Sequence, residues 1–116
     1  MKTRTLGWTG EKLSTIGIGC WALGGGHWAY SWGPQDDEES VRTICEALDR
    51  GITWIDTAPI YGLGHSEEIV GKALKSSSHK PFIATKCGLT WNSRGKVKPR
   101  LKRESIRQEL EQSLGR

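Results

Sequence analysis

The sequence has no long run of apolar residues, and its apolar stretches are only a few residues each. A membrane-spanning helix needs about 20 such residues, so no membrane span is predicted. No apolar segment follows the basic N-terminus, which argues against a secretory signal. The three cysteines, Cys20, Cys45 and Cys87, are odd in number and lack the spacing of a metal site. We therefore expect a cytoplasmic protein with reduced thiols and no bound metal.

The chain has the size and composition of one domain, residues 1–116, with 35% apolar and 26% charged residues. Its net charge of +4 is uneven, because basic residues crowd between Arg94 and Arg107. Such a run can bind phosphates, and RNA binding is one interpretation. No aromatic side chains interleave with these charges to stack on bases, which favours a solvated loop and helix face. We expect no nucleic-acid partner.

Strand-like and helix-like patterns alternate along the sequence. A hairpin is predicted from Thr3 to Thr15, with its turn at Gly7–Gly10. Three strand–helix units follow. The expected strands cover residues 16–20, 52–55 and 81–85, and the helices begin near Asp36, Ser66 and Arg103. This alternation implies a parallel sheet with right-handed crossovers.

The start of the first helix is the best marked. Asp36 and Glu39 have the spacing of a capping box, and Gly51 marks the end of the helix. Ser66 is expected to cap the second helix. The apolar positions of the three helices follow helical spacing: Val41, Ile44, Cys45 and Leu48; Ile69, Val70, Ala73 and Leu74; Ile106, Leu110 and Leu114.

A glycine pattern at residues 17–22 matches the fingerprint of dinucleotide-binding domains. That fingerprint functions only where a helix begins at its last position, so that the helix N-terminus meets the pyrophosphate. The three glycines at 24–26 follow instead, and each costs a helix about 1 kcal/mol. The sequence therefore argues against a Rossmann-type site.

Asp56 and Lys86 each follow an apolar strand, where an unpaired charge is expensive. Tyr61 lies in the loop directly after the Asp56 strand. Because the carboxyl ends of neighbouring parallel strands lie at one edge, the three side chains can face one pocket. A structural ion pair beside a packing tyrosine explains the same spacing, and the spacing alone leaves both interpretations open.

The local sequence around these residues resembles motifs of the aldo-keto reductase family. The stretch GITWIDTAPIYG at 51–62, followed by GHSEEIVG at 64–71, is similar to the family signature, and IATK at 83–86 is similar to its lysine strand. The segment WGPQDD at 32–37 resembles the branch that includes bacterial general-stress reductases. The resemblance covers essentially the whole chain. It implies an α/β fold, the N-terminal portion of a (β/α)8 TIM barrel with a hairpin and about three βα units, in which the barrel is incomplete.

The resemblance also implies a chemistry, the NADPH-dependent reduction of aldehyde or ketone carbonyls to alcohols. Asp56, Tyr61 and Lys86 match catalytic positions of the family. A phenol with a pKa of about 10 is a poor acid at neutral pH. A lysine ammonium beside it favours the phenolate, and a carboxylate keeps that lysine charged and oriented. By motif position we expect four residues to contact the cofactor: Gly19, Cys20, Trp21 and Asp56. Four aromatic residues are expected either to line the mouth of the substrate pocket or only to cover the top of the barrel: Trp28, Tyr30, Trp32 and Trp91.

The family's catalytic histidine would end the next strand, past Arg116, and His27, His65 and His79 do not match its position. The later cofactor-binding strands would also lie past Arg116. We therefore expect the isolated chain to bind NADPH poorly, to turn over little and to be loosely folded. Two alternatives stay open. One is a non-catalytic subunit resembling potassium-channel β subunits, and the other is an inactive truncated remnant. The carbonyl substrate and the choice between NADPH and NADH also stay open.

Overall fold

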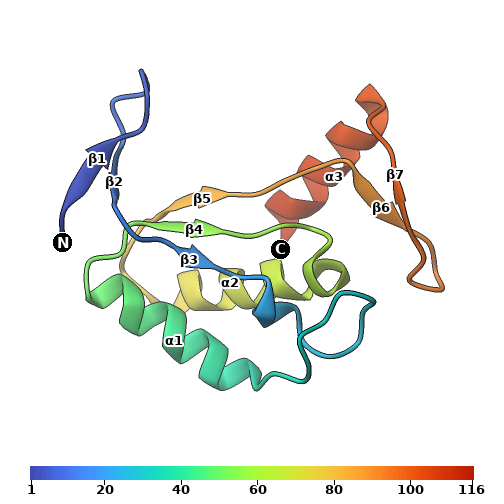
Figure 1. Cartoon of the computed structure of the whole chain (residues 1–116), viewed down its shortest axis with the longest axis horizontal. Coiled ribbons are helices and arrows are strands. Elements are labelled where there is room, and N and C mark those ends of the chain that lie inside the picture. The colour runs from blue at the N-terminus through green and yellow to red at the C-terminus, as the bar shows by residue number, and fades with distance from the viewer.

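A computed structural model describes the whole chain, Met1–Arg116. It contains two hairpins, a parallel sheet, three helices and two short 3₁₀ turns (Figure 1). In chain order the elements are β1 (Thr3–Thr5), β2 (Lys12–Ser14), β3 (Ile18–Gly19), η1 (Ala22–Gly24), α1 (Asp37–Asp49), β4 (Trp54–Asp56), η2 (Tyr61–Gly64), α2 (His65–Ser76), β5 (Phe82–Ala84), β6 (Leu89–Trp91), β7 (Val97–Pro99) and α3 (Arg103–Gly115).

The parallel sheet consists of β3, β4 and β5, side by side in sequence order. Ile55 pairs with Ile18 on one side and with Ile83 on the other. This confirms the predicted parallel sheet, although each strand is shorter than its apolar run. No further strand pairs with the outer edge of β3 or of β5, so the sheet is open and the barrel is incomplete, as expected.

Helices α1 and α2 cover one face of this sheet (Figure 1). Their apolar stripes pack together against β4, as predicted from the spacing. Burying a side chain of this size stabilises the fold by about 1.5–3 kcal/mol. The buried core residues are Cys20, Ile44, Leu48, Ile55, Ile69, Val70 and Ala73.

The N-terminus of α1 has the expected cap. An Asp36 side-chain oxygen accepts a hydrogen bond from the Glu39 backbone N–H at 2.7 Å. The first turn is acidic, which stabilises the positive end of the helix dipole. After the helix, Gly51 adopts a φ of 89°, a left-handed conformation that glycine tolerates best.

The prediction that Ser66 caps α2 is wrong. The cap position is Gly64, which makes no side-chain hydrogen bond, and Ser66 lies inside the first turn. Its fully buried hydroxyl donates to the Cys20 carbonyl at 2.8 Å and lies 3.2 Å from the Thr57 hydroxyl. Ser66 therefore ties α2 to the ends of β3 and β4 instead of capping the helix.

The hairpin β6–β7 was not expected, because the region after the third strand was assigned to loops. It pairs Trp91 with Val97 and Leu89 with Pro99. The Asn92 side chain closes its turn by accepting the backbone N–H groups of Arg94 and Lys96, each at 3.0 Å. The hairpin stands beside α3 at the end of the sheet away from β1–β2 (Figure 1).

Helix α3 forms where it was predicted, but its apolar stripe is not in the core. Leu110 and Leu114 are exposed, and the buried positions of the helix are Ser105 and Glu109. The basic side chains between Arg94 and Arg107 are also exposed, as a solvated face requires. None of the three helices has the length and apolar character needed to cross a membrane.

Candidate active site

The structure brings Asp56 and Lys86 together at the carboxyl ends of neighbouring strands. Asp56 is the last residue of β4, and Lys86 follows β5 by two residues. The Lys86 ammonium donates to an Asp56 side-chain oxygen at 2.7 Å and to the Thr57 carbonyl at 2.9 Å. Both side chains are partly exposed, so the pair faces the open rim of the sheet.

Tyr61 lies at the same rim. The Lys86 ammonium is 5.0 Å from the centre of the Tyr61 ring. The tyrosine is almost fully buried, and its ring packs against Trp21 with the ring centres 5.0 Å apart. The Tyr61 ring, the Lys86 ammonium and the Asp56 carboxylate therefore lie close together at the ends of β4 and β5.

The surroundings of Lys86 act on its pKa in opposite directions. Burial of the ammonium lowers the pKa, whereas its hydrogen bond to Asp56, the nearby Tyr61 phenol and the Asp56 charge raise it. The raising effects are larger, so the pKa of Lys86 lies above its ordinary value. Lys86 is therefore a permanent cation at neutral pH, next to a tyrosine.

The chain after Tyr61 is in an unusual conformation that the sequence explains. Gly62, Leu63 and Gly64 all have positive φ angles, of 63°, 55° and 105°. A side chain on Gly62 would collide with the Gly24 backbone, so only glycine fits there. Leu63 is the one non-glycine residue of the chain with a positive φ, and such strain is often found beside functional sites.

The residues expected to contact a cofactor divide into two kinds. Gly19 is exposed, and a Cβ placed on it would meet no atom within 4 Å, so the end of β3 is open. It is in register with Asp56. Trp21 is partly exposed and donates its indole N–H to the Tyr30 carbonyl at 2.9 Å. The end of β3 is therefore an open strand end, next to the Trp21 ring and the Asp56 carboxylate.

Cys20, in contrast, lies wholly in the core. Its backbone N–H donates to the Asp56 carbonyl at 2.9 Å, and its own carbonyl accepts from Ser66. Burial, and then the Asp56 charge, raise the pKa of its thiol to about 12, although Lys86 lowers it slightly. Cys20 therefore supports the site by packing beneath it.

The aromatic residues expected at the substrate mouth are not all together. Trp28 packs against Trp21, Tyr30 and Tyr61, and its indole N–H is buried without a partner. Trp91 packs against the small apolar cluster that contains Tyr61. Trp32, in contrast, is 80% exposed.

The three histidines make other contacts or none. His65 pairs with Asp37 and His79 with Asp49, each at 2.8 Å, and His27 is exposed. Asp37 and Asp49 lie on α1 and His65 on α2, whereas His79 lies in the connection between α2 and β5.

Sequence reasoning missed two buried glutamates near the Lys86 strand, Glu67 on α2 and Glu109 on α3. Glu67 accepts hydrogen bonds from Thr85 at 2.6 Å and from Arg116 at 2.6 Å. Glu109 accepts the Gly88 backbone N–H at 2.9 Å. Neither has a sequence signal, since an isolated glutamate in a helix is ordinarily a solvated residue.

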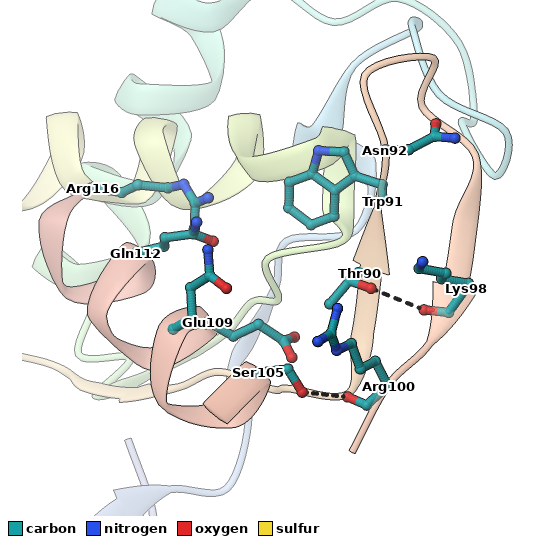
Figure 2. Close-up of a pocket in the computed structure, with 10 residues that line it drawn as sticks. Thr90, Trp91, Asn92, Lys98, Arg100, Ser105, Glu109, Gln112 and Arg116 are labelled. Carbon is teal, nitrogen blue, oxygen red and sulfur yellow. Dashed lines mark hydrogen bonds between the residues drawn. The ribbon is translucent and has the colours of Figure 1, made fainter. Parts of the chain in front are cut away.

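Two cavities adjoin Glu109. One, of about 90 Å³, is lined by Glu109, Lys86 and Cys87 together with apolar residues. The other, of about 330 Å³, is a polar hollow between α3 and the β6–β7 hairpin that includes Trp91 and Arg100 (Figure 2).

Comparison with known proteins gives a consistent result. The profile of the Aldo/keto reductase family matches residues 15–116. The chain is 46% identical over 110 residues to the Bacillus subtilis protein "Aldo-keto reductase YhdN", covering 93% of this chain and 32% of that protein. It is 44% identical over 127 residues to the Escherichia coli "NADH-specific methylglyoxal reductase", covering 100% of this chain and 38% of that protein.

Solved structures agree in fold. The glycerol dehydrogenase AKR11B4 from Gluconobacter oxydans superimposes with a TM-score of 0.81 at 43% identity, over 97% of this chain and 35% of that one. The aldo-keto reductase AKR11C1 from Bacillus halodurans gives a TM-score of 0.82 at 32% identity, over 99% of this chain and 36% of that one. The chain thus spans about a third of the length of the relatives it matches.

Proposed function

The chain belongs to the aldo/keto reductase family, and we propose that it carries the proton-donating half of a site that reduces aldehyde or ketone carbonyls to alcohols. The observation that supports this proposal is the meeting of Asp56, Tyr61 and Lys86 at the ends of adjacent parallel strands. In barrels of this kind the active site lies at the carboxyl ends of the strands.

Each of the three residues has a distinct part in the proposed chemistry. A bound nicotinamide nucleotide supplies the hydride. Tyr61 donates a proton to the carbonyl oxygen as it gains negative charge. Lys86 stabilises the phenolate that remains, and Asp56 keeps Lys86 oriented and positively charged.

We propose that Gly19, Trp21 and Asp56 face the nicotinamide, with Cys20 packed beneath them. The open strand end at Gly19 and its register with Asp56 support this arrangement. NADPH is the expected donor, and the name of the Escherichia coli relative makes NADH the alternative to test. Trp28 and Trp91 are proposed to wall the substrate side, since both pack around Tyr61.

A chimera tests the proposal directly. The matching segment of the Escherichia coli NADH-specific methylglyoxal reductase is replaced by this chain, so that the relative supplies the remainder of the barrel. Reduction of methylglyoxal is then followed with NADH. The chimera is expected to be active, and Tyr61→Phe is expected to lower kcat by about 100-fold or more, because general acid catalysis contributes on that order.

The chain contains its own matched control, since Tyr30 is its other tyrosine and is exposed. Tyr30→Phe is expected to leave kcat unchanged. A Tyr61→Phe chimera with most of its turnover would show that the assignment of Tyr61 is wrong. A chimera that binds the nucleotide but reduces no carbonyl would favour a non-catalytic subunit.

A further inference from the structure

The segment that carries Lys86, residues 85–87, makes no backbone hydrogen bonds. The ladder of β5 ends at Ala84. Elsewhere in the sheet the backbone position is fixed by ladder bonds. The direction in which Lys86 leaves the sheet must therefore be set by the two ends of this segment and by side chains.

The first end is fixed by the sheet. The Thr57 backbone N–H donates to the Ala84 carbonyl at 2.9 Å, which continues the pairing of β4 with β5 by one bond. On this side the Thr85 hydroxyl also donates to Glu67 of α2 at 2.6 Å. The segment therefore begins from a rigid point.

The second end is Gly88, and it is held from both sides. Its N–H donates to a carboxylate oxygen of Glu109 at 2.9 Å, and its carbonyl accepts the Arg100 N–H at 2.9 Å. Gly88 has a φ of 103°, and a Cβ there would collide with Leu101. Glu109 is the only side chain that bonds to this peptide.

Glu109 is well placed to hold that orientation. It is 5% exposed, and it lies with Ser105 on the side of α3 that faces the hairpin (Figure 2). It also lines the cavity of about 90 Å³ that it shares with Lys86 and Cys87. A buried carboxylate is costly unless it is hydrogen-bonded. The Oε1 atom of Glu109 is buried without a partner, so the Gly88 N–H on Oε2 is the one hydrogen bond that offsets this cost.

We propose that Glu109 is a positioning residue for Lys86, which anchors the Gly88 peptide and thereby holds the Lys86 ammonium against Asp56. The placement of Lys86 matters for carbonyl reduction only if the proposed function is correct, but the positioning itself can be measured without turnover.

Trace acetylation of the chain within the chimera, where the barrel is complete, tests the proposal. Acetic anhydride is applied at limiting amounts at pH 9, and mass spectrometry compares Lys86 with Lys75, an exposed lysine that serves as an internal reference. In the unchanged chain Lys86 is expected to react more slowly than Lys75, because its ammonium is held by Asp56. Glu109→Ala is expected to raise the ratio of Lys86 to Lys75 labelling by about three-fold, equivalent to about half a pKa unit.

Two variants separate positioning from general loosening. Glu109→Gln keeps an oxygen that accepts the Gly88 N–H, so its labelling ratio is expected to match that of the unchanged chain. Ser40→Ala removes the bond of a buried hydroxyl to the Asp36 carbonyl at the start of α1, and neither residue contributes a hydrogen bond to Gly88 or Arg100. It is expected to lower Tm and to leave the labelling ratio unchanged.

Three results would overturn the proposal. The first is that Lys86 is labelled as fast as Lys75 in the unchanged chain. The second is that the labelling ratio is the same in Glu109→Ala and the unchanged chain. The third is that Ser40→Ala raises the ratio as much as Glu109→Ala does. If Glu109→Ala does not fold, Glu109→Asp takes its place, since its shorter side chain draws the carboxylate back from Gly88.

A kinetic measurement separates this proposal from the proposed function. In the active chimera, Glu109→Ala is expected to lower kcat with little change in KM. A normal kcat with altered labelling would count against the proposed function and leave the positioning intact.

Discussion

The ammonium of Lys86 lies 2.7 Å from a carboxylate oxygen of Asp56, although 30 residues separate them in the chain. The parallel pairing of β4 and β5 brings them together, because it places Asp56 opposite Ala84, the last residue of the strand before Lys86. The pair is therefore a product of sheet register, and it depends on no local sequence contact.

Burial lowers the pKa of Lys86, while the hydrogen bond to Asp56, the neighbouring Tyr61 and the Asp56 charge raise it. Asp56→Asn removes the charge of the carboxylate and leaves the burial, so the pKa of Lys86 is expected to fall. Titration of the Lys86 side-chain resonance by NMR measures this change. Glu46→Gln is the matched control, because it removes one carboxylate from an exposed pair with Arg50. A Lys86 pKa that is the same in Asp56→Asn and Glu46→Gln would contradict the prediction.

The sequence contained enough information to place this ion pair. Apolar runs that end in Asp56 and Lys86 predict two strands with charges at their carboxyl ends, and alternation with helices predicts that the strands are parallel. The stripes of α1 and α2 were predictable for a similar reason, since a period of 3.6 residues identifies a buried helix face. In each case a local pattern reports directly on one physical property, burial.

Other features depend on contacts that no local pattern encodes. Ser66 has the residue type of a cap, but left-handed residues before it start the helix earlier and turn its hydroxyl into the core. The β6–β7 hairpin follows from the Asn92 turn, which was interpreted as part of a loop. Glu109 is buried because α3 packs against Gly88, a contact 21 residues away in sequence.

The ion pair between Arg116 and Glu67 is expected to contribute strongly to stability. Its atoms are 2.6 Å apart, with side chains only 17% and 5% exposed. Arg116→Ala leaves a buried carboxylate without its counter-ion and is expected to cost about 3 kcal/mol in the free energy of unfolding. Urea denaturation measures the loss. Arg107→Ala, which removes an exposed pair with Glu111, is expected to change little. Equal losses in the two variants would show that burial does not strengthen the Arg116 pair.

The glycine after Tyr61 is expected to be irreplaceable because of a collision and not only because of its backbone angle. Gly62 has a φ of 63°, and a Cβ there would strike the Gly24 backbone. Gly10 has a φ of 81° with no atom within 4 Å of a Cβ, so it carries comparable backbone strain without the collision. Gly10→Ala is expected to cost about 1–2 kcal/mol, and Gly62→Ala clearly more. Urea denaturation compares them, and equal costs would exclude the collision.

Alkaline pH is expected to destabilise the fold through Cys20. Burial raises the pKa of its thiol from 9.0 to about 12. Above pH 9 the unfolded chain releases this proton while the folded chain keeps it, so the unfolded state binds fewer protons and the free energy of unfolding falls. The slope is about 1.4 kcal/mol per pH unit for one group, and it continues until the folded thiol also ionises near pH 12. The Lys86 pKa, also raised, adds a loss of the same sign at the upper end of this range.

Comparing variants isolates the contribution of Cys20 from that of the other lysines and tyrosines that titrate in this range. Cys20→Ala is expected to reduce the decline in the free energy of unfolding between pH 9 and 11, measured by urea denaturation at each pH. Cys87→Ala removes an exposed thiol and is expected to keep the full decline. Because the comparison uses slopes, the constant cost of the small cavity left by Cys20→Ala does not affect it. Parallel curves for Cys20→Ala and Cys87→Ala would mean that the Cys20 thiol ionises as readily in the folded chain as in the unfolded one, which is incompatible with its complete burial beneath Asp56.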